Sequence, residues 1–219
     1  MKQINDVRKY PSPAVTPQAL AWKGTELWLS SRDLGTLQRI DPLQGTIEEE
    51  LDPPGVVWAA VAIQDGWRFT IGQGLNDDRY VYGYSEGGGF EQLFACPDFT
   101  GSYLSCDGSN LYLSQWYKGE IHEVDDEGKV KATVKIGAEI CGHTCVGETL
   151  YVLRGHENQD VPGKEEEWRI ARLHPRKQKP QVEDLATVPF AARSLTFDGE
   201  RFWSNHRAAN EIISFTLPD

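Results

Sequence analysis

Apolar and polar residues alternate over short segments along the whole chain, and glycine-containing turns separate these segments. Five segments share one pattern, in which a glycine is followed three residues later by an apolar residue and usually then an aromatic one. The anchoring glycines are Gly24, Gly66, Gly108, Gly147 and Gly199, so successive copies are 42, 42, 39 and 52 residues apart. A period of roughly 40–45 residues per four-stranded unit is typical of β-propeller blades.

Each copy has the order of elements that a blade requires. A strand leads into an Asp-Gly or Gly turn, a second strand follows, and two further strands complete the unit after a loop and a second turn. Sustained helical periodicity is absent, so essentially no helix is expected. We therefore predict an all-β fold, one five-bladed β-propeller domain over residues 1–219, with four-stranded blades at about residues 16–54, 55–98, 99–138, 139–189 and 190–219.

The fifth copy lacks a fourth strand because the chain stops at residue 219. Residues 4–10 resemble the outer strands of other copies, so we predict that they pair antiparallel with residues 211–215 and close the ring. A β-sandwich of many short strands is the alternative fold, but it leaves the period and the incomplete last copy unexplained.

Composition narrows the partners and the compartment. The formal net charge of -11 and the pI near 4.9 argue against nucleic acid or an anionic membrane as the main partner. The first residues contain no apolar signal-peptide core, and no apolar run is long enough to span a bilayer. We therefore predict a cytoplasmic protein whose four cysteines are reduced.

Propeller geometry predicts where a site lies. Loops that lead into the first strands and loops that leave the second strands converge at one end of the central channel, and the Asp-Gly turns lie at the other end. Loops on a rigid scaffold concentrate binding and catalysis. The side chains expected at this mouth to bind a ligand are Gln18, Arg32, Trp58, Gln73, Gln115, Trp116, Arg154, Arg193 and Arg207, with His143 and His206 as candidate acid/base groups.

This set is rich in guanidinium and amide groups and contains almost no carboxylate, although the chain carries 33 Asp and Glu residues. Arginine pairs bidentately with carboxylates, and tryptophan supplies an aromatic wall. The set therefore predicts a small anionic or carboxylate-bearing ligand. The alternative is that these polar groups only satisfy backbone atoms at the mouth of the channel.

Cysteine and histidine spacing raises the question of a metal. Cys141, His143 and Cys145 alternate on one predicted strand, and Cys106 belongs to the preceding copy. The paired spacings of structural zinc sites are absent, and Cys106 and Cys145 align with apolar positions. We predict no metal and no other cofactor.

The longest insertion, residues 154–168, separates the second and third strands of the fourth copy. Its position on the same end as the mouth suggests a rim or lid over one side of the pocket, or else a plain surface loop. His156, Glu157, Asn158 and Asp160 are potential calcium ligands, but the spacing of an EF-hand loop is absent.

The repeats resemble the broad class of YVTN-type and SMP-30-type propellers, and the first repeat resembles the glutamine cyclotransferase family of five-bladed propellers. Thr16, Gln18, Leu20, Asp41 and Gly45 fit that family's pattern. The resemblance implies that Gln18 is a pocket residue. The family's proton-shuttling acidic residue has no counterpart, because the chain reads WAAVA there. The cation cage of SMP-30-type enzymes is also missing.

Two hypotheses from different classes follow. The first is a propeller that binds a small anionic ligand. The second is a cyclotransferase-, lyase- or hydrolase-type enzyme, with His206 or His143 as acid/base and Arg154 or Arg193 as electrostatic stabiliser. A third option is a platform for protein partners on the same face.

Overall fold

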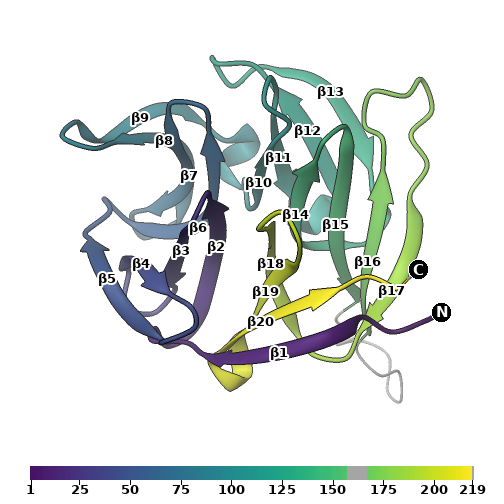
Figure 1. Cartoon of the computed structure of the whole chain (residues 1–219). Helices are drawn as coiled ribbons and strands as arrows, with labels where there is room; N and C mark the ends of the chain where they lie inside the picture. Colours follow the sequence, from purple (N-terminus) through teal and green to yellow (C-terminus); the bar gives the residue numbers. More distant parts are fainter. Residues whose placement is uncertain (157–166, 219) are drawn as a thin grey trace.

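The computed structural model describes residues 1–156 and 167–218, and it places twenty strands in five antiparallel four-stranded sheets. The sheets surround a common centre as the blades of a propeller (Figure 1). The prediction of an all-β, five-bladed propeller is confirmed. The described residues contain three short 3₁₀ turns and no α-helix: η1 (Pro97–Phe99), η2 (Trp116–Lys118) and η3 (Arg207–Ala209).

Each of the first four blades runs from the centre outward in chain order. The first two blades are β2 (Pro17–Lys23), β3 (Glu26–Ser31), β4 (Leu37–Asp41), β5 (Thr46–Leu51), and β6 (Val56–Ile63), β7 (Gly66–Gln73), β8 (Asp78–Ser85), β9 (Gly89–Ala95). The next two are β10 (Leu104–Cys106), β11 (Leu111–Gln115), β12 (Glu120–Val124), β13 (Val130–Lys135), and β14 (Glu139–Val146), β15 (Thr149–His156), β16 (Glu167–Leu173), β17 (Glu183–Val188).

The fifth blade combines both ends of the chain. Its strands are β18 (Ala192–Phe197), β19 (Phe202–His206), β20 (Glu211–Thr216) and, outermost, β1 (Asn5–Pro11). In Figure 1 the purple β1 lies along the yellow β20, and the two chain ends lie close together. The predicted antiparallel closure is confirmed, with Arg8 opposite Ser214 and Tyr10 opposite Ile212.

Side-chain contacts fasten this closure. The Tyr10 ring stacks on Trp203 with 5.3 Å between ring centroids. Arg201, which is only 9% exposed, donates to Asp6 and to Ser214 Oγ. The N-terminal segment also reaches the fourth blade, where Ile4 N donates to Thr187 O at 3.1 Å. The N-terminal segment, which consists of Ile4 and β1, therefore links two blades.

Packing between blades forms the core. The inner strands β2, β6, β10, β14 and β18 contact one another around the ring, and β18 contacts β2. Apolar side chains fill the spaces between neighbouring sheets, among them the fully buried Leu29, Phe69, Leu113 and Phe215. In residues 1–156 and 167–218, no helix has the length and hydropathy that a bilayer crossing requires.

Candidate functional site

A cavity of about 320 Å³ opens where the inner strands begin, on the face opposite the Asp-Gly turns. We call it the mouth cavity. All five blades contribute to it. The residues that line it are Gln18, Arg32, Trp58, Arg79, Ser102, Tyr103, Trp116, Glu139, Ile140, Arg193 and Arg207.

Irregularities in the inner strands shape this lining. The pairing register shifts between Pro17 and Leu20 in β2, between Val57 and Ala59 in β6, and also in β14 and β18. A β-bulge bends its strand and changes the direction of a side chain. Gln18 and Trp58 both lie within such a shift, which directs them toward the channel.

Buried hydroxyl groups on the second strands support these bulges. Ser30 Oγ accepts from Ala19 N at 2.8 Å and donates to Val57 O. Ser114 Oγ accepts from Tyr103 N at 2.9 Å, and Ser204 Oγ donates to Ser194 O at 2.7 Å. Backbone groups at the bulges therefore find hydrogen-bond partners in these hydroxyl groups.

The wall formed by the second blade is a preorganised group of three side chains. The Arg79 guanidinium lies 3.9 Å from the centroid of the Trp58 ring. Asp77 joins them, because it accepts from Trp58 Nε1 at 2.9 Å and from Arg79 Nη2 at 2.9 Å. Arg79 Nη1 also donates to Gly101 O and Ser102 Oγ, each at 3.0 Å. Trp58 and Arg79 are thus fixed before any ligand arrives.

The deepest part of the cavity combines Gln18, Arg207 and Tyr103. Gln18 is 1% exposed, donates to Trp58 O at 3.0 Å, and accepts from Arg207 Nη2. Burial lowers the pKa of Arg207, and the nearby Arg193 and Arg32 guanidiniums lower it further. Burial raises the pKa of Tyr103, so its hydroxyl stays protonated and can donate a hydrogen bond.

On the side of the fourth and fifth blades, Glu139 is the one carboxylate among the described residues that line the cavity. Arg193 Nη2 lies 4.0 Å from Glu139 Oε1, and Arg193 Nη1 contacts Cys141 Sγ and Ala192 O. The lining as a whole carries four arginines and one glutamate, so it is positive inside a strongly acidic protein.

Six of the nine residues predicted to bind a ligand line this cavity: Gln18, Arg32, Trp58, Trp116, Arg193 and Arg207. Trp116 and Arg207 begin η2 and η3, directly after a second strand ends. The position one residue beyond the strand end thus faces the cavity. Strand alternation then turns the preceding residue away.

The prediction that Gln73, Gln115, Arg154 and His206 face the mouth is therefore corrected, since none of them lines the cavity. Gln73 Nε2 donates to Tyr82 Oη at 2.6 Å. Gln115 Nε2 donates to Pro97 O at 2.8 Å.

Arg154 and His206 contact residues of their own blade or of the loop that leads into that blade. Arg154 pairs with Asp184 at 2.5 Å and donates to Ile136 O. The His206 ring packs against Phe190, and its Nδ1 lies 3.6 Å from Glu211 Oε2. These contacts are structural in character.

His143 also lies away from the cavity, because β14 begins four residues earlier, at Glu139. It is 2% exposed, its Nδ1 lies 2.7 Å from Ser105 Oγ, and its Nε2 lies 3.0 Å from Tyr103 O. The carbonyl requires Nε2 to be the protonated donor, so Nδ1 accepts from Ser105. Burial lowers the pKa of His143 to about 3, which keeps the ring neutral.

All four cysteines are free thiols, of which Cys96 and Cys141 are buried and Cys106 and Cys145 are partly buried. Burial raises the pKa of Cys96 and Cys145 to about 12 and also raises that of Cys106. Within the part of the chain that the structure describes, no three His, Cys, Asp or Glu side chains converge as metal ligands do. The absence of a metal stays a prediction. Residues 157–166 of the predicted rim insertion lie outside the described residues.

Sequence reasoning missed Arg79, Tyr103, Glu139 and Ile140 as lining residues. Arg79 belongs to β8, a third strand, and reaches the mouth because Asp77 and Ser102 hold its guanidinium there. Tyr103 and Glu139 lie where the first strands of their blades begin, a position that signals the mouth once the strand starts are known.

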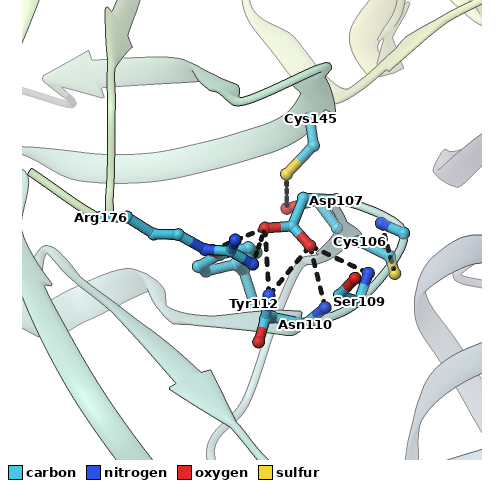
Figure 2. A network of polar contacts seen from close by, with 9 residues as sticks. Cys106, Asp107, Ser109, Asn110, Tyr112, Cys145 and Arg176 are labelled. Atoms are coloured by element: carbon cyan, nitrogen blue, oxygen red, sulfur yellow. Dashed lines mark hydrogen bonds and ion pairs between the residues drawn. The ribbon is translucent and has the colours of Figure 1, made fainter.

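The opposite face is organised by its turns. Asp107 Oδ1 accepts from Ser109 N at 3.0 Å and Asn110 N at 2.9 Å, and its Oδ2 accepts from Tyr112 Oη at 3.0 Å. Arg176, from the loop after β16, donates to the same carboxylate at 2.8 Å (Figure 2). Asp107 therefore caps a turn and connects the third blade to the fourth.

Comparison with known proteins defines the class of the molecule. No protein-family model matches the sequence, and no curated protein matches it. Among solved structures, Kuenenia stuttgartiensis hydrazine synthase is similar over 88% of this chain, with a TM-score of 0.59 and 11% identity. This chain spans 62% of the length of that chain.

Other similar structures extend over most of both chains. A structural genomics protein of unknown function from Bacteroides thetaiotaomicron VPI-5482 has a TM-score of 0.58 at 10% identity, covering 99% of this chain and 73% of that one. A chain of the nidogen/laminin complex has a TM-score of 0.57 at 16% identity, covering 85% and 76%. Such low identities show the fold alone, and the chain is a five-bladed β-propeller.

Proposed function

We propose that this propeller binds a small anionic, carboxylate-bearing ligand in the mouth cavity. The observation that supports the proposal is the convergence of four guanidinium groups and two indole rings on one small cavity. Its volume of about 320 Å³ is at the lower end for a small-molecule site. Arginine is the side chain that best matches the planar geometry of a carboxylate.

Preorganisation strengthens this proposal. Asp77 and Ser102 fix Arg79, and Gln18 holds Arg207, so little side-chain entropy is lost when a ligand binds. The resemblance of the first repeat to glutamine cyclotransferases contributes Gln18 as a pocket residue. The resemblance does not support the family's cyclisation reaction, because the segment WAAVA of β6 lacks the acidic residue that would shuttle the proton.

Histidine-dependent catalysis is the less favoured proposal for this site. His143 is buried and held neutral, and His206 lies outside the cavity lining. A general acid or base must come within hydrogen-bond reach of the reacting group. Binding therefore fits the geometry better than an acid–base reaction at either histidine.

A thermal-shift screen of carboxylates, sugar acids and small peptides, followed by calorimetry of the hits, tests the proposal. Arg207→Gln removes a charged contact and should lower the affinity for a ligand found in the screen by roughly ten- to a hundredfold, or about 1.5–3 kcal/mol of binding free energy. Arg172→Gln, which removes an exposed arginine of β16, is the matched control. Hits that bind Arg207→Gln as tightly as wild type would contradict the proposal.

A second candidate function is docking of a protein partner on the same face. Among the residues that the structure describes, large apolar side chains are exposed on loops around the mouth, including Leu34, Leu75, Phe99, Trp116 and Tyr117. Apolar patches on soluble proteins often mark interaction sites. The nidogen/laminin complex is an example of a similar propeller in an assembly with another protein.

Site-specific photo-crosslinking distinguishes this second function. A crosslinker at Leu75, which is fully exposed on the β7–β8 loop, should capture a defined partner. The same crosslinker at Leu93, exposed on the outer strand β9, is the control. Equal capture at both positions would count against a partner on the mouth face.

A further inference from the structure

The four arginines of the mouth cavity differ in their ionic partners. Arg79 pairs with Asp77 at 2.9 Å, and Arg193 lies 4.0 Å from Glu139. Among residues 1–156 and 167–218, neither Arg32 nor Arg207 forms an ion pair with a carboxylate. The cavity therefore contains two guanidinium groups whose charge the described carboxylates leave unmatched.

These two groups lie at different depths. Arg207 is partly buried in η3, donates to the Gln18 amide oxygen, and has a buried Nε with no hydrogen-bond partner. Arg32 is exposed just after β3, and its guanidinium lies 5.7 Å from the centroid of the Trp58 ring. The fifth and first blades that carry them are neighbours, since β18 contacts β2.

From this arrangement we infer that the ligand is a small dicarboxylate. One carboxylate binds Arg207 and the Tyr103 hydroxyl in the deep part, and the other binds Arg32 at the rim. The inference rests on the proposed function, because it specifies the ligand of that same cavity.

Two separate carboxylates fit better than one doubly charged group. A single phosphate group would have to contact both the partly buried Arg207 and the exposed Arg32 at the same time. A short carbon chain places its two carboxylates at different depths within a lining that also contains the Trp58 ring. The electrostatics agree, since repulsion from Arg32 and Arg193 contributes to the lowered pKa of Arg207, and bound anions relieve that repulsion.

Calorimetry at constant ionic strength with three probes tests the inference. Succinate carries two carboxylates, succinamate replaces one of them with an amide of the same shape, and methyl phosphate places two charges on one group. Wild type should bind succinate roughly tenfold or more tightly than succinamate. Methyl phosphate should bind more weakly than succinate.

Two variants test which arginine binds which carboxylate of succinate. Arg32→Gln should abolish the preference for succinate over succinamate while it leaves the affinity for succinamate within about twofold. Arg207→Gln should weaken both probes by roughly tenfold or more. Arg172→Gln is the control and should change neither affinity.

The outcomes separate this inference from the function on which it rests. Equal affinity for succinate and succinamate, with both weakened in Arg207→Gln, overturns the dicarboxylate and leaves the anion site in place. Tighter binding of methyl phosphate than of succinate also overturns it. If no carboxylate binds wild type at all, the proposed function and this inference both fail.

Discussion

The Arg79 guanidinium lies 3.9 Å from the centroid of the Trp58 ring, and the carboxylate of Asp77 hydrogen-bonds to both side chains. A cation over an aromatic face is held by the quadrupole of the ring, and a shared acceptor fixes the orientation of both partners. This relationship turns an inner-strand tryptophan and a third-strand arginine into one rigid wall of the mouth cavity.

Removal of the shared acceptor should therefore destabilise the protein. Asp77→Ala removes the acceptor of Trp58 Nε1 and the charged acceptor of the Arg79 guanidinium, so we expect the free energy of unfolding to fall by about 1–3 kcal/mol. Urea denaturation measures the change. Asp78→Ala, which removes the carboxylate of the next residue, is the control and should cost less. Equal losses in the two variants would show that the wall has no special stability.

Gly72 makes room for this wall. A Cβ at position 72 would overlap Asp77 Oδ1 and lie 2.8 Å from Trp58 Nε1. Gly72→Ala should cost about 1–3 kcal/mol, as overpacking does, and should also weaken ligand binding because Trp58 must move. Gly83→Ala is the matched strand control, since the nearest atoms to its Cβ would be the flexible Arg68 Nη1, at 3.3 Å, and Leu93 Cδ1, at 3.6 Å, an ordinary contact distance. A ligand affinity unchanged in Gly72→Ala would contradict the proposed position of the wall.

The sequence allowed the fold to be predicted because the repeat and the missing strand are both features of spacing. Pairing of β1 with β20 follows from the same count, without any knowledge of side-chain contacts. The candidate site was only partly predictable. Gln18 and Trp58 lie where first strands begin, so their place follows from topology.

The remaining errors have two physical causes. Neighbouring residues of a strand point to opposite sides, so a shift of one residue decides whether Gln115 or Trp116 faces the channel. Aligning the repeats by their loops does not fix this position to within one residue. Tertiary contacts determine the positions of Arg79 and His143. Arg79 reaches the mouth because Asp77 holds it, and His143 is buried because β14 starts four residues before it. Neither fact leaves a local signal in the sequence.

The ring closure predicts a strong effect of truncation. Deletion of residues 1–10 exposes the edge of β20 and removes Tyr10, which stacks on Trp203, and Asp6, which accepts from Arg201. We expect the loss of several kcal/mol out of the roughly 5–15 kcal/mol available to a domain. The urea midpoint of the truncated protein measures this loss. A midpoint equal to that of the full chain would show that β1 contributes nothing to stability.

His143 predicts acid sensitivity. The pKa of its ring falls from 6.5 to about 3 in the folded state because the ring is buried. As the pH falls below 6.5, the unfolded chain binds a proton that the folded chain excludes. The free energy of unfolding therefore decreases toward acid, by at most roughly 1.4 kcal/mol per pH unit from this group.

Denaturation between pH 7 and 5 tests this prediction, since most carboxylates stay ionised there. His143→Gln should show a flatter dependence on pH than wild type, whatever its stability at pH 7. His174→Gln, which removes an exposed histidine, should keep the wild-type slope. A wild-type slope in His143→Gln would mean that folding does not lower the pKa of His143.

The turn face should affect stability but not ligand binding. Asp107 accepts hydrogen bonds from two turn amides, from Tyr112 and from Arg176 (Figure 2), so Asp107→Ala leaves several partly buried donors unsatisfied. We expect a loss of about 1–3 kcal/mol or more in the free energy of unfolding. Arg176→Ala should cost less than about 1 kcal/mol, because the Arg176 side chain is 57% exposed and Asp107 keeps its hydrogen bonds from two turn amides and from Tyr112. Both variants should bind any mouth-cavity ligand with wild-type affinity in calorimetry, since Asp107 lies at the opposite end of the inner strand that begins beside Tyr103. A weaker affinity in Arg176→Ala, at unchanged stability, would instead assign ligand binding to the turn face.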